Sequence, residues 1–186
     1  MQYKLTTPCT AEDLAPLKAG DTVLLSGVVY TARDQAHKRM LEALDKGEKL
    51  PFDLEGSAIY YVGPTPERPD EIIGSAGPTT SGRMDAMSPR LLDLGNKIMI
   101  GKGKRDAAVK EAVVRNGAVY LAALGGAGAL MAQSVKTLEV IAWPDLGCEA
   151  VRRLTVEDMP LTVILDAHGG DLYLSGPEAY REAQVK

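Results

Sequence analysis

The sequence predicts one α/β domain over residues 1–186, with a mixed sheet flanked by helices. Its 186 residues, 45% of them hydrophobic and 25% charged, suit a single globular domain with one core. Strand-like and helix-like hydrophobic patterns alternate along most of the chain, which is typical of a layered α/β domain. Several neighbouring strand patterns have no helix between them, so we expect a mixed sheet rather than a purely parallel one.

The first half of the chain combines a buried strand with an amphipathic helix. Residues 23–30 form a mostly apolar run, which predicts a strand, and apolar side chains recur at helical spacing over residues 33–46. Residues 57–62 and 71–73 have the pattern of further strands. Between them, residues 63–70 contain three prolines, which oppose both a helix and a central strand and therefore predict a surface loop.

The second half of the chain continues this alternation. Turn residues mark the element boundaries, such as Asn116-Gly117 at the end of a helix. We predict strands over residues 97–100, 118–122, 135–143 and 161–166, and helices after Gly82, over 105–115, 129–134 and 148–153, and after Pro177.

Composition argues against several classes of function. The formal net charge is −4 and no tract is rich in Lys or Arg, so we expect no nucleic-acid partner. The longest strongly apolar stretch, residues 118–130, falls well short of the roughly 20 residues that cross a bilayer, so we expect no membrane span. The amino terminus lacks the features of a secretory signal, which makes the cytoplasm the expected location. Cys9 and Cys148 fit no CxxC pattern, so we expect no metal site within this chain.

Three junctions between a predicted strand and the helix that follows it carry a cation. At the first junction, Thr31 is expected to cap the helix, with Asp34 three residues further on and Arg33 in the first helical turn. A cation there opposes the helix dipole by about 0.3–1 kcal/mol unless an anion lies nearby. The position of Arg33 therefore indicates an anion site.

The other two junctions add hydroxyl groups, backbone amides and two more cations. Residues 77–83 read Gly-Pro-Thr-Thr-Ser-Gly-Arg and place Arg83 at a helix start, and Lys102 lies between two glycines just after a strand. Ligands of open α/β sheets bind beyond the carboxyl ends of strands, where the three loops meet if their strands are adjacent and parallel. Together with Arg33, these residues then form a site for a small dianion. The alternative is that each cation is a solvated surface residue.

Glycine-rich segments and histidines give weaker indications. Residues 101–104 do not form a Walker loop, and residues 125–128 lack the third glycine of a dinucleotide fingerprint, so we expect no nucleotide site. His37 falls one helical turn after Arg33 and can reach the same site, whereas His168 lies in a predicted turn. Neither histidine has a second ligand at metal spacing.

Three segments carry a resemblance to a known family. Residues 26–39 contain Tyr-Thr-Ala-Arg-Asp, residues 77–85 read Gly-Pro-Thr-Thr-Ser-Gly-Arg-Met-Asp, and residues 101–103 read Gly-Lys-Gly. From about Leu5 to Asp171 the chain resembles the carboxy-terminal domain of class I, iron–sulfur-dependent fumarases. It equally resembles the beta subunit of L(+)-tartrate dehydratase.

The resemblance implies a swivelling β/β/α domain that closes over an active site shared with an alpha subunit. In that family the alpha part carries a [4Fe-4S] cluster on three cysteines, which implies that this chain is half of an enzyme, binds no cluster alone and assembles as α2β2. Carried over by motif, Arg33, Arg83 and Lys102 bind the substrate carboxylates, and Thr79 removes the proton from the carbon beside the carboxylate. The secondary candidates for the site are His37, Asp34 and Thr80.

The reaction implied by the resemblance is the reversible loss of water from a four-carbon dicarboxylate, either malate to fumarate or tartrate to oxaloacetate. Removal of the proton builds negative charge on a carboxylate, and cations fixed around it stabilise the transition state more than the ground state. The residues leave the choice of substrate open. They also leave open a different class of function, a non-catalytic dicarboxylate-binding or regulatory module that has the same anion site.

Overall fold

The computed structural model describes residues 1–123 and 126–184. The strands are β1 (Gln2–Thr7), β2 (Thr22–Thr31), β3 (Ala58–Tyr60), β4 (Ile98–Gly101), β5 (Val119–Ala122), β6 (Val135–Ala142) and β7 (Val151–Leu165). The α-helices are α1 (Ala11–Leu14), α2 (Asp34–Asp45), α3 (Ser88–Asp93), α4 (Ala107–Arg115), α5 (Gly128–Gln133) and α6 (Leu172–Gln184). Two 3-10 helices complete these elements, η1 (Ser81–Met84) and η2 (Pro144–Glu149).

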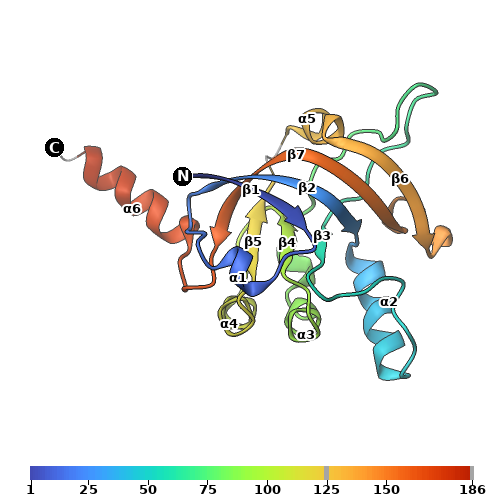
Figure 1. Cartoon of the computed structure of the whole chain (residues 1–186), viewed down its shortest axis with the longest axis horizontal. Coiled ribbons are helices and arrows are strands. Elements are labelled where there is room, and N and C mark those ends of the chain that lie inside the picture. The colour runs from blue at the N-terminus through green and yellow to red at the C-terminus, as the bar shows by residue number, and fades with distance from the viewer. Residues whose placement is uncertain (124–125, 185–186) are drawn as a thin grey trace.

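The strands form one seven-stranded mixed sheet in the order β1-β2-β3-β4-β5-β7-β6. Neighbouring strands from β1 to β5 are parallel, whereas β7 runs antiparallel to β2, β5 and β6. Because β7 pairs with both β5 and β2, the sheet closes into a ring of β2, β3, β4, β5 and β7. The predicted α/β fold with a mixed sheet flanked by helices is therefore confirmed (Figure 1).

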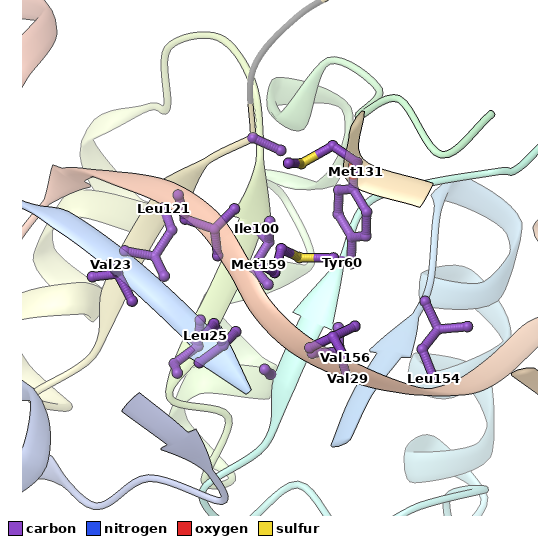
Figure 2. Close-up of a cluster of buried hydrophobic side chains, with 14 of the residues drawn as sticks. Val23, Leu25, Val29, Tyr60, Ile100, Leu121, Met131, Leu154, Val156 and Met159 are labelled. Atoms are coloured by element: carbon purple, nitrogen blue, oxygen red, sulfur yellow. The ribbon is translucent and has the colours of Figure 1, made fainter. Parts of the chain in front are cut away.

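Apolar side chains fill the interior of the ring. Alternate residues of β2, namely Val23, Leu25 and Val29, are fully buried there, as strand geometry requires for one face of a sheet. They lie in one cluster with Tyr60 of β3, and Figure 2 shows Met131 of α5 beside the Tyr60 ring. Full burial of one such aliphatic side chain contributes about 1.5–3 kcal/mol, so this cluster is a main source of the stability of the fold.

A second apolar cluster lies between the sheet and three helices. Helices α2, α3 and α4 cover the same side of the sheet, and α5 lies on the opposite side of the molecule (Figure 1). The strands β3, β4 and β5 present alternate residues to the ring interior and to these helices. The second cluster includes Ile59, Met99 and Tyr120 from the strands and Met40, Leu92 and Val113 from the helices. The result is three layers, with strands over strands over helices.

The long strand β7 contains a β-bulge that keeps its apolar residues inside. Leu154 and Val156 face the core before the bulge, and Met159 and Leu161 face it beyond the bulge, so the inward positions change from even to odd numbers. The register against β2 shifts at this point, and Asp158 has a positive φ of 46°. One additional residue on β7 therefore reverses which side chains point inward.

Two predicted elements are wrong and several boundaries differ, above all that of the strand predicted over residues 161–166, which begins at Val151. Residues 71–73 form bends in a loop rather than a strand, and Ile73 is buried because the loop folds back onto the core. Residues 148–153 do not form a helix, because η2 ends and β7 begins within them. The last helix begins at Leu172 and not after Pro177, which lies inside it. The elements β1 and α1 were not predicted.

Close packing explains one glycine of the 125–128 segment. A Cβ at Gly128, the first residue of α5, would lie 2.3 Å from Ser75 Oγ and 2.9 Å from Gly77 N, so only glycine allows this approach. Gly125 lies outside the described residues. Among the helices of the described ranges, none has the length and apolar character needed to cross a membrane.

Candidate functional site

The first predicted site residue, Arg33, lies at the point where β2 ends and α2 begins. The amide of Ala32 donates to Tyr60 O at 3.1 Å, which ties this junction to the end of β3. Arg33 itself is the N-cap of α2, and no side chain caps the helix. The predicted cap, Thr31, is wrong, because it is the last residue of β2 and its hydroxyl accepts from Arg152 N and donates to Ala150 O.

The Arg33 side chain lies in a mostly buried position beside two carboxylates. Its Nε is 3.2 Å from Glu149 Oε1 and 3.7 Å from Asp34 Oδ2, and 22% of the side chain is exposed. A Cβ at Gly63 would lie 2.8 Å from Arg33 Nη1, so a glycine there leaves room for the guanidinium. Nothing in the local sequence pattern indicates Glu149 as a neighbour, because 116 residues separate it from Arg33.

Three buried polar atoms at this junction have no hydrogen-bond partner. Within the described part of the chain these are Arg33 Nε, Asp34 Oδ2 and His37 Nε2. The contact of Arg33 Nε with Glu149 is close enough for an ion pair but lacks hydrogen-bond alignment. An unpaired buried polar group costs about 1–3 kcal/mol, and such groups are rare in native proteins. All three atoms lie within five residues, so unpaired buried polar groups are concentrated at this junction.

His37 is fully buried one turn into α2. Its Nδ1 lies 3.0 Å from Arg33 O, and because a carbonyl only accepts, Nδ1 carries the proton and Nε2 has a free lone pair. The ring packs edge-on against Tyr61, with centroids 5.2 Å apart. Burial lowers the pKa of His37 to about 4, although its hydrogen bond to Arg33 opposes this change. The imidazole is therefore neutral at pH 7.

The predicted threonines lie on an extended segment that joins two neighbouring strand ends. Thr79 N donates to Tyr61 O at 2.8 Å, just beyond β3. Thr80 forms a parallel bridge with Lys102, just beyond β4, and Ser81 N donates to Lys102 O at 2.9 Å. Thr79 is half-buried and Thr80 is exposed. These backbone contacts hold the threonine segment and the Lys102 loop together.

The remaining predicted cations are exposed at the same edge of the sheet. Arg83 lies on η1, two residues after Ser81, and the side chains of both Arg83 and Lys102 are exposed. Within the described ranges neither has a carboxylate within 4.0 Å, in contrast to Arg33. The strands β2, β3 and β4 are adjacent and parallel, so the segments that carry all three cations follow the same edge of the sheet.

Among the residues that the structure describes, no set of ligands fits an iron–sulfur cluster. In the described ranges no three side chains among His, Cys, Asp and Glu are grouped to hold a metal ion. Of the two cysteines, Cys9 is buried in the ring interior and Cys148 is exposed on η2. Burial raises the pKa of the Cys9 thiol to about 11, which disfavours the thiolate that a metal needs.

A cavity lies away from these cations. It has a volume of about 680 Å³ and lies between residues 65–75, α5 and the start of β6. None of the predicted site residues lines it. The predicted cations and threonines lie instead at the ends of the parallel strands.

The fold and the motifs within residues 26–39, 77–85 and 101–103 together define an α/β domain of a recognisable class. The chain belongs to the family described as Fumarase C-terminus, which matches residues 1–176. It is 42% identical over 170 residues to a protein of Methanocaldococcus jannaschii assigned as an L(+)-tartrate dehydratase beta subunit, covering 88% of this chain and 87% of that protein. It is 32% identical to the L(+)-tartrate dehydratase beta subunit of Escherichia coli, covering 98% of this chain and 92% of that protein.

Class I fumarate hydratases are also similar, over a smaller share of their length. The aerobic class I fumarate hydratase of Escherichia coli is 40% identical over 151 residues, which is 80% of this chain but 28% of that protein. The match therefore covers most of each tartrate dehydratase beta subunit but less than a third of the fumarate hydratase.

Proposed function

We propose that this chain is the beta subunit of an iron–sulfur-dependent hydro-lyase that adds water to, or removes it from, a four-carbon dicarboxylate. The substrate pair is fumarate and malate, or tartrate and oxaloacetate. In this proposal Arg33, Arg83 and Lys102 bind the substrate carboxylates and Thr79 accepts the proton from the carbon beside the carboxylate. The enzyme is expected in the cytoplasm.

One observation carries the proposal. Arg33, the Thr79 segment and Lys102 follow three adjacent parallel strands, and buried polar atoms beside Arg33 have no partner. Two arginines and a lysine at one sheet edge suit a doubly charged small acid, because guanidinium groups bind carboxylates through paired donors. The names of the relatives supply the reaction class.

The chemistry assigned to these residues follows from where charge develops. As the carbon loses its proton, negative charge grows on the adjacent carboxylate, and fixed cations around that group lower the barrier. Thr79 is a weak base while its hydroxyl is neutral, so the positive charge of Arg83 and Lys102 has to favour its deprotonated form. Asp34, His37 and Thr80 remain secondary candidates, and the burial of His37 favours a role in packing over proton exchange with solvent.

The proposal needs a partner. The residues of this chain do not fit a cluster, so we assign the [4Fe-4S] group to an alpha subunit and derive no step through it. An α2β2 assembly is the expected stoichiometry. The beta-subunit names of the two tartrate dehydratase relatives support a partner of this kind.

Co-expression tests the proposal. The chain is produced alone and together with a cysteine-bearing subunit encoded beside it, and both preparations are assayed for hydration of fumarate and dehydration of tartrate. Activity toward one substrate, only in the combined preparation, is expected. If the chain binds dicarboxylates tightly but never associates with such a subunit, it is a binding module instead. If it neither associates nor binds a dicarboxylate, the proposed site is wrong as well.

A further inference from the structure

A guanidinium lies fully buried beneath the loops that carry Arg83 and Lys102. It belongs to Arg105, whose side chain has 0% exposure. Its Nε donates to Asp85 Oδ1 at 2.6 Å, and its Nη2 donates to Ser88 Oγ at 2.9 Å. A buried charge of this kind is strongly unfavourable unless it is paired and hydrogen-bonded, and here both conditions are met.

Two aromatic rings complete the surroundings of this guanidinium. The Arg105 carbon Cζ lies 5.4 Å from the centroid of the Tyr61 ring and 4.9 Å from that of Tyr120. A guanidinium over aromatic faces is stabilised further by the charge distribution of the rings. The hydroxyl of Tyr61 also lies 3.1 Å from Ser88 Oγ, so Arg105 and Tyr61 share one partner on α3.

The carboxylate of Asp85 joins the Arg83 segment to the Lys102 loop. Asp85 follows Arg83 by two residues, and its Oδ2 accepts from the backbone amide of Asp106 at 2.7 Å. One oxygen therefore bonds the Arg105 side chain and the other bonds the next residue of the chain. This pairing fixes the end of η1 against the segment that connects Lys102 to α4.

A second connection runs through Ser81 and Tyr120. The amide of Lys102 donates to Ser81 Oγ at 3.0 Å, Tyr120 Oη lies 2.9 Å from Ser81 Oγ, and Tyr120 Oη donates to Gly103 O at 3.0 Å. One arrangement of protons satisfies every group, with Ser81 donating to Tyr120 and accepting from Lys102. A Cβ at Gly101 would lie 1.9 Å from Ser81 Oγ, so glycine is required for this contact.

We propose that Arg105 is a positioning residue of the site, which holds the Arg83 segment and the Lys102 loop in one mutual arrangement through Asp85, Ser88 and the Tyr120 ring. The idea that this arrangement serves dicarboxylate binding rests on the proposed function. Arginine suits the task because its planar fork reaches Asp85 and Ser88 at once. A lysine has a single ammonium group and cannot reproduce both contacts in that geometry.

Hydrogen exchange on the chain alone tests the positioning directly. In Arg105→Lys, the backbone amides of Lys102 and Asp106 are expected to exchange about tenfold faster, since their acceptors are no longer held in place. The matched control is Arg115→Lys, which removes a similar forked contact with Asp93 at the surface. The control should leave both amides unchanged. Unchanged exchange in Arg105→Lys would overturn the proposal.

A milder variant covers the case in which Arg105→Lys does not fold. Tyr120→Phe keeps the ring over Arg105 and removes only the hydroxyl that links Ser81 to Gly103. The Lys102 amide alone is expected to exchange faster in this variant, while Asp106 keeps its protection. If Lys102 exchanges as in the wild type, the second connection is refuted.

Kinetics of the reconstituted enzyme test the link to the site. Arg105→Lys is expected to reduce kcat/KM by about 100-fold, with a raised KM, because displaced cations bind the carboxylates less well. In an Arg83→Ala background the same change should cost much less, since Arg105 acts through Arg83. Equal losses in both backgrounds would show a general structural defect. The hydrogen-exchange results do not depend on enzyme activity. Failure of the proposed reaction and failure of the positioning role therefore give different outcomes.

Discussion

Two regions at the same edge of the sheet are built in opposite ways. Around Arg105, every buried polar atom of the side chain has a partner. Around Arg33, buried polar atoms of three residues lack one. Arg105 lies over the Tyr61 ring, and the Arg33 junction is joined to Tyr60 O by the Ala32 amide, so both regions lie near the end of β3. Under the proposed function, the Arg105 half of the site is formed in advance and a ligand or a partner completes the Arg33 half.

The carboxylates illustrate the same difference. Asp85 makes a short, aligned bond to Arg105 and accepts a backbone amide as well, whereas Glu149 approaches Arg33 without alignment. A satisfied buried network fixes one conformation, while an imperfect ion pair can exchange its partner at lower cost. We therefore expect substitutions near Arg33 to change how strongly an added dicarboxylate stabilises the protein. Substitutions near Arg105 should instead alter the geometry of the site.

The largest expected effect is on catalysis, at Thr79. Thr79→Ala in the reconstituted enzyme should lower kcat by about 100- to 10,000-fold with little change in KM, because a proton acceptor is lost while the cations remain. Steady-state kinetics measure this, with Thr137→Ala on the exposed face of β6 as the control. A Thr79→Ala enzyme that still exchanges the substrate proton at the normal rate would remove Thr79 from the mechanism.

Removal of the exposed cation on η1 is expected to be next in size. Arg83→Ala should lose about 2–4 kcal/mol of transition-state stabilisation, seen as a fall in kcat/KM, because one charge at the developing carboxylate is missing. The matched control is Arg90→Ala, which removes an exposed arginine paired with Asp45 on the far side of α3. Unchanged kcat/KM in Arg83→Ala would contradict the proposed role of Arg83 in stabilising charge on the substrate carboxylate.

The buried histidine predicts a dependence of stability on pH. The pKa of His37 is lowered to about 4 in the folded chain from an ordinary value of 6.5, so the unfolded chain binds more protons between these values. Stability from this source is fully present above pH 6.5 and is lost as the pH falls toward 4, by about 3 kcal/mol.

Denaturant unfolding at several values between pH 4 and 7 measures the slope of the free energy of unfolding against pH. His37→Gln should reduce it, while His168→Gln, at the exposed histidine, should leave it in place. An identical slope in His37→Gln would mean that other groups cause the acid sensitivity and that the Arg33 half is not weakened by protonation.

The smallest expected effect separates the two halves most directly. Glu149→Gln should lower the free energy of unfolding by about 1 kcal/mol, because the ion pair with Arg33 is partly exposed and poorly aligned. Millimolar succinate should then stabilise the variant more than it stabilises the wild type, since the freed guanidinium binds a carboxylate. Thermal unfolding with and without succinate measures this, and Asp145→Asn, at the exposed pair with Arg39, is the control. Equal stabilisation of variant and wild type would argue against an anion at Arg33.

Local patterns in the sequence predicted the parts of the fold that local physics determines. The apolar run of β2 and the helical spacing of α2 predicted the first junction, and the rule for strand ends predicted that Arg33 and Lys102 lie at the same edge of the sheet. The course of β7 could not be predicted in the same way, because its bulge at Asp158 breaks the alternation that marks a strand. The strand predicted over residues 71–73 was wrong because a buried loop residue such as Ile73 gives the same short apolar pattern as a strand residue.

The contacts that complete the site depend on the tertiary structure. Glu149 reaches Arg33 from the end of η2, 116 residues further along the chain, and Asp85 meets Arg105 across 20 residues. No spacing rule connects such residues, and their types are ordinary for a surface. Only the closure of the sheet, which brings the end of β2 beside the start of β7, creates the first of these contacts.

The additional residue at Asp158 sets a limit on length changes in the second half of β7. If β7 kept its length but lost the bulge, regular alternation from Leu154 and Val156 would turn Pro160 and its even-numbered neighbours toward the ring interior. A deletion beyond the bulge likewise puts the residues that follow it out of phase, so the chain should tolerate substitution there better than deletion. Glycine is the replacement best suited to position 158, because it adopts a positive φ at no steric cost. A single backbone irregularity thus determines which changes in chain length this barrel can accept.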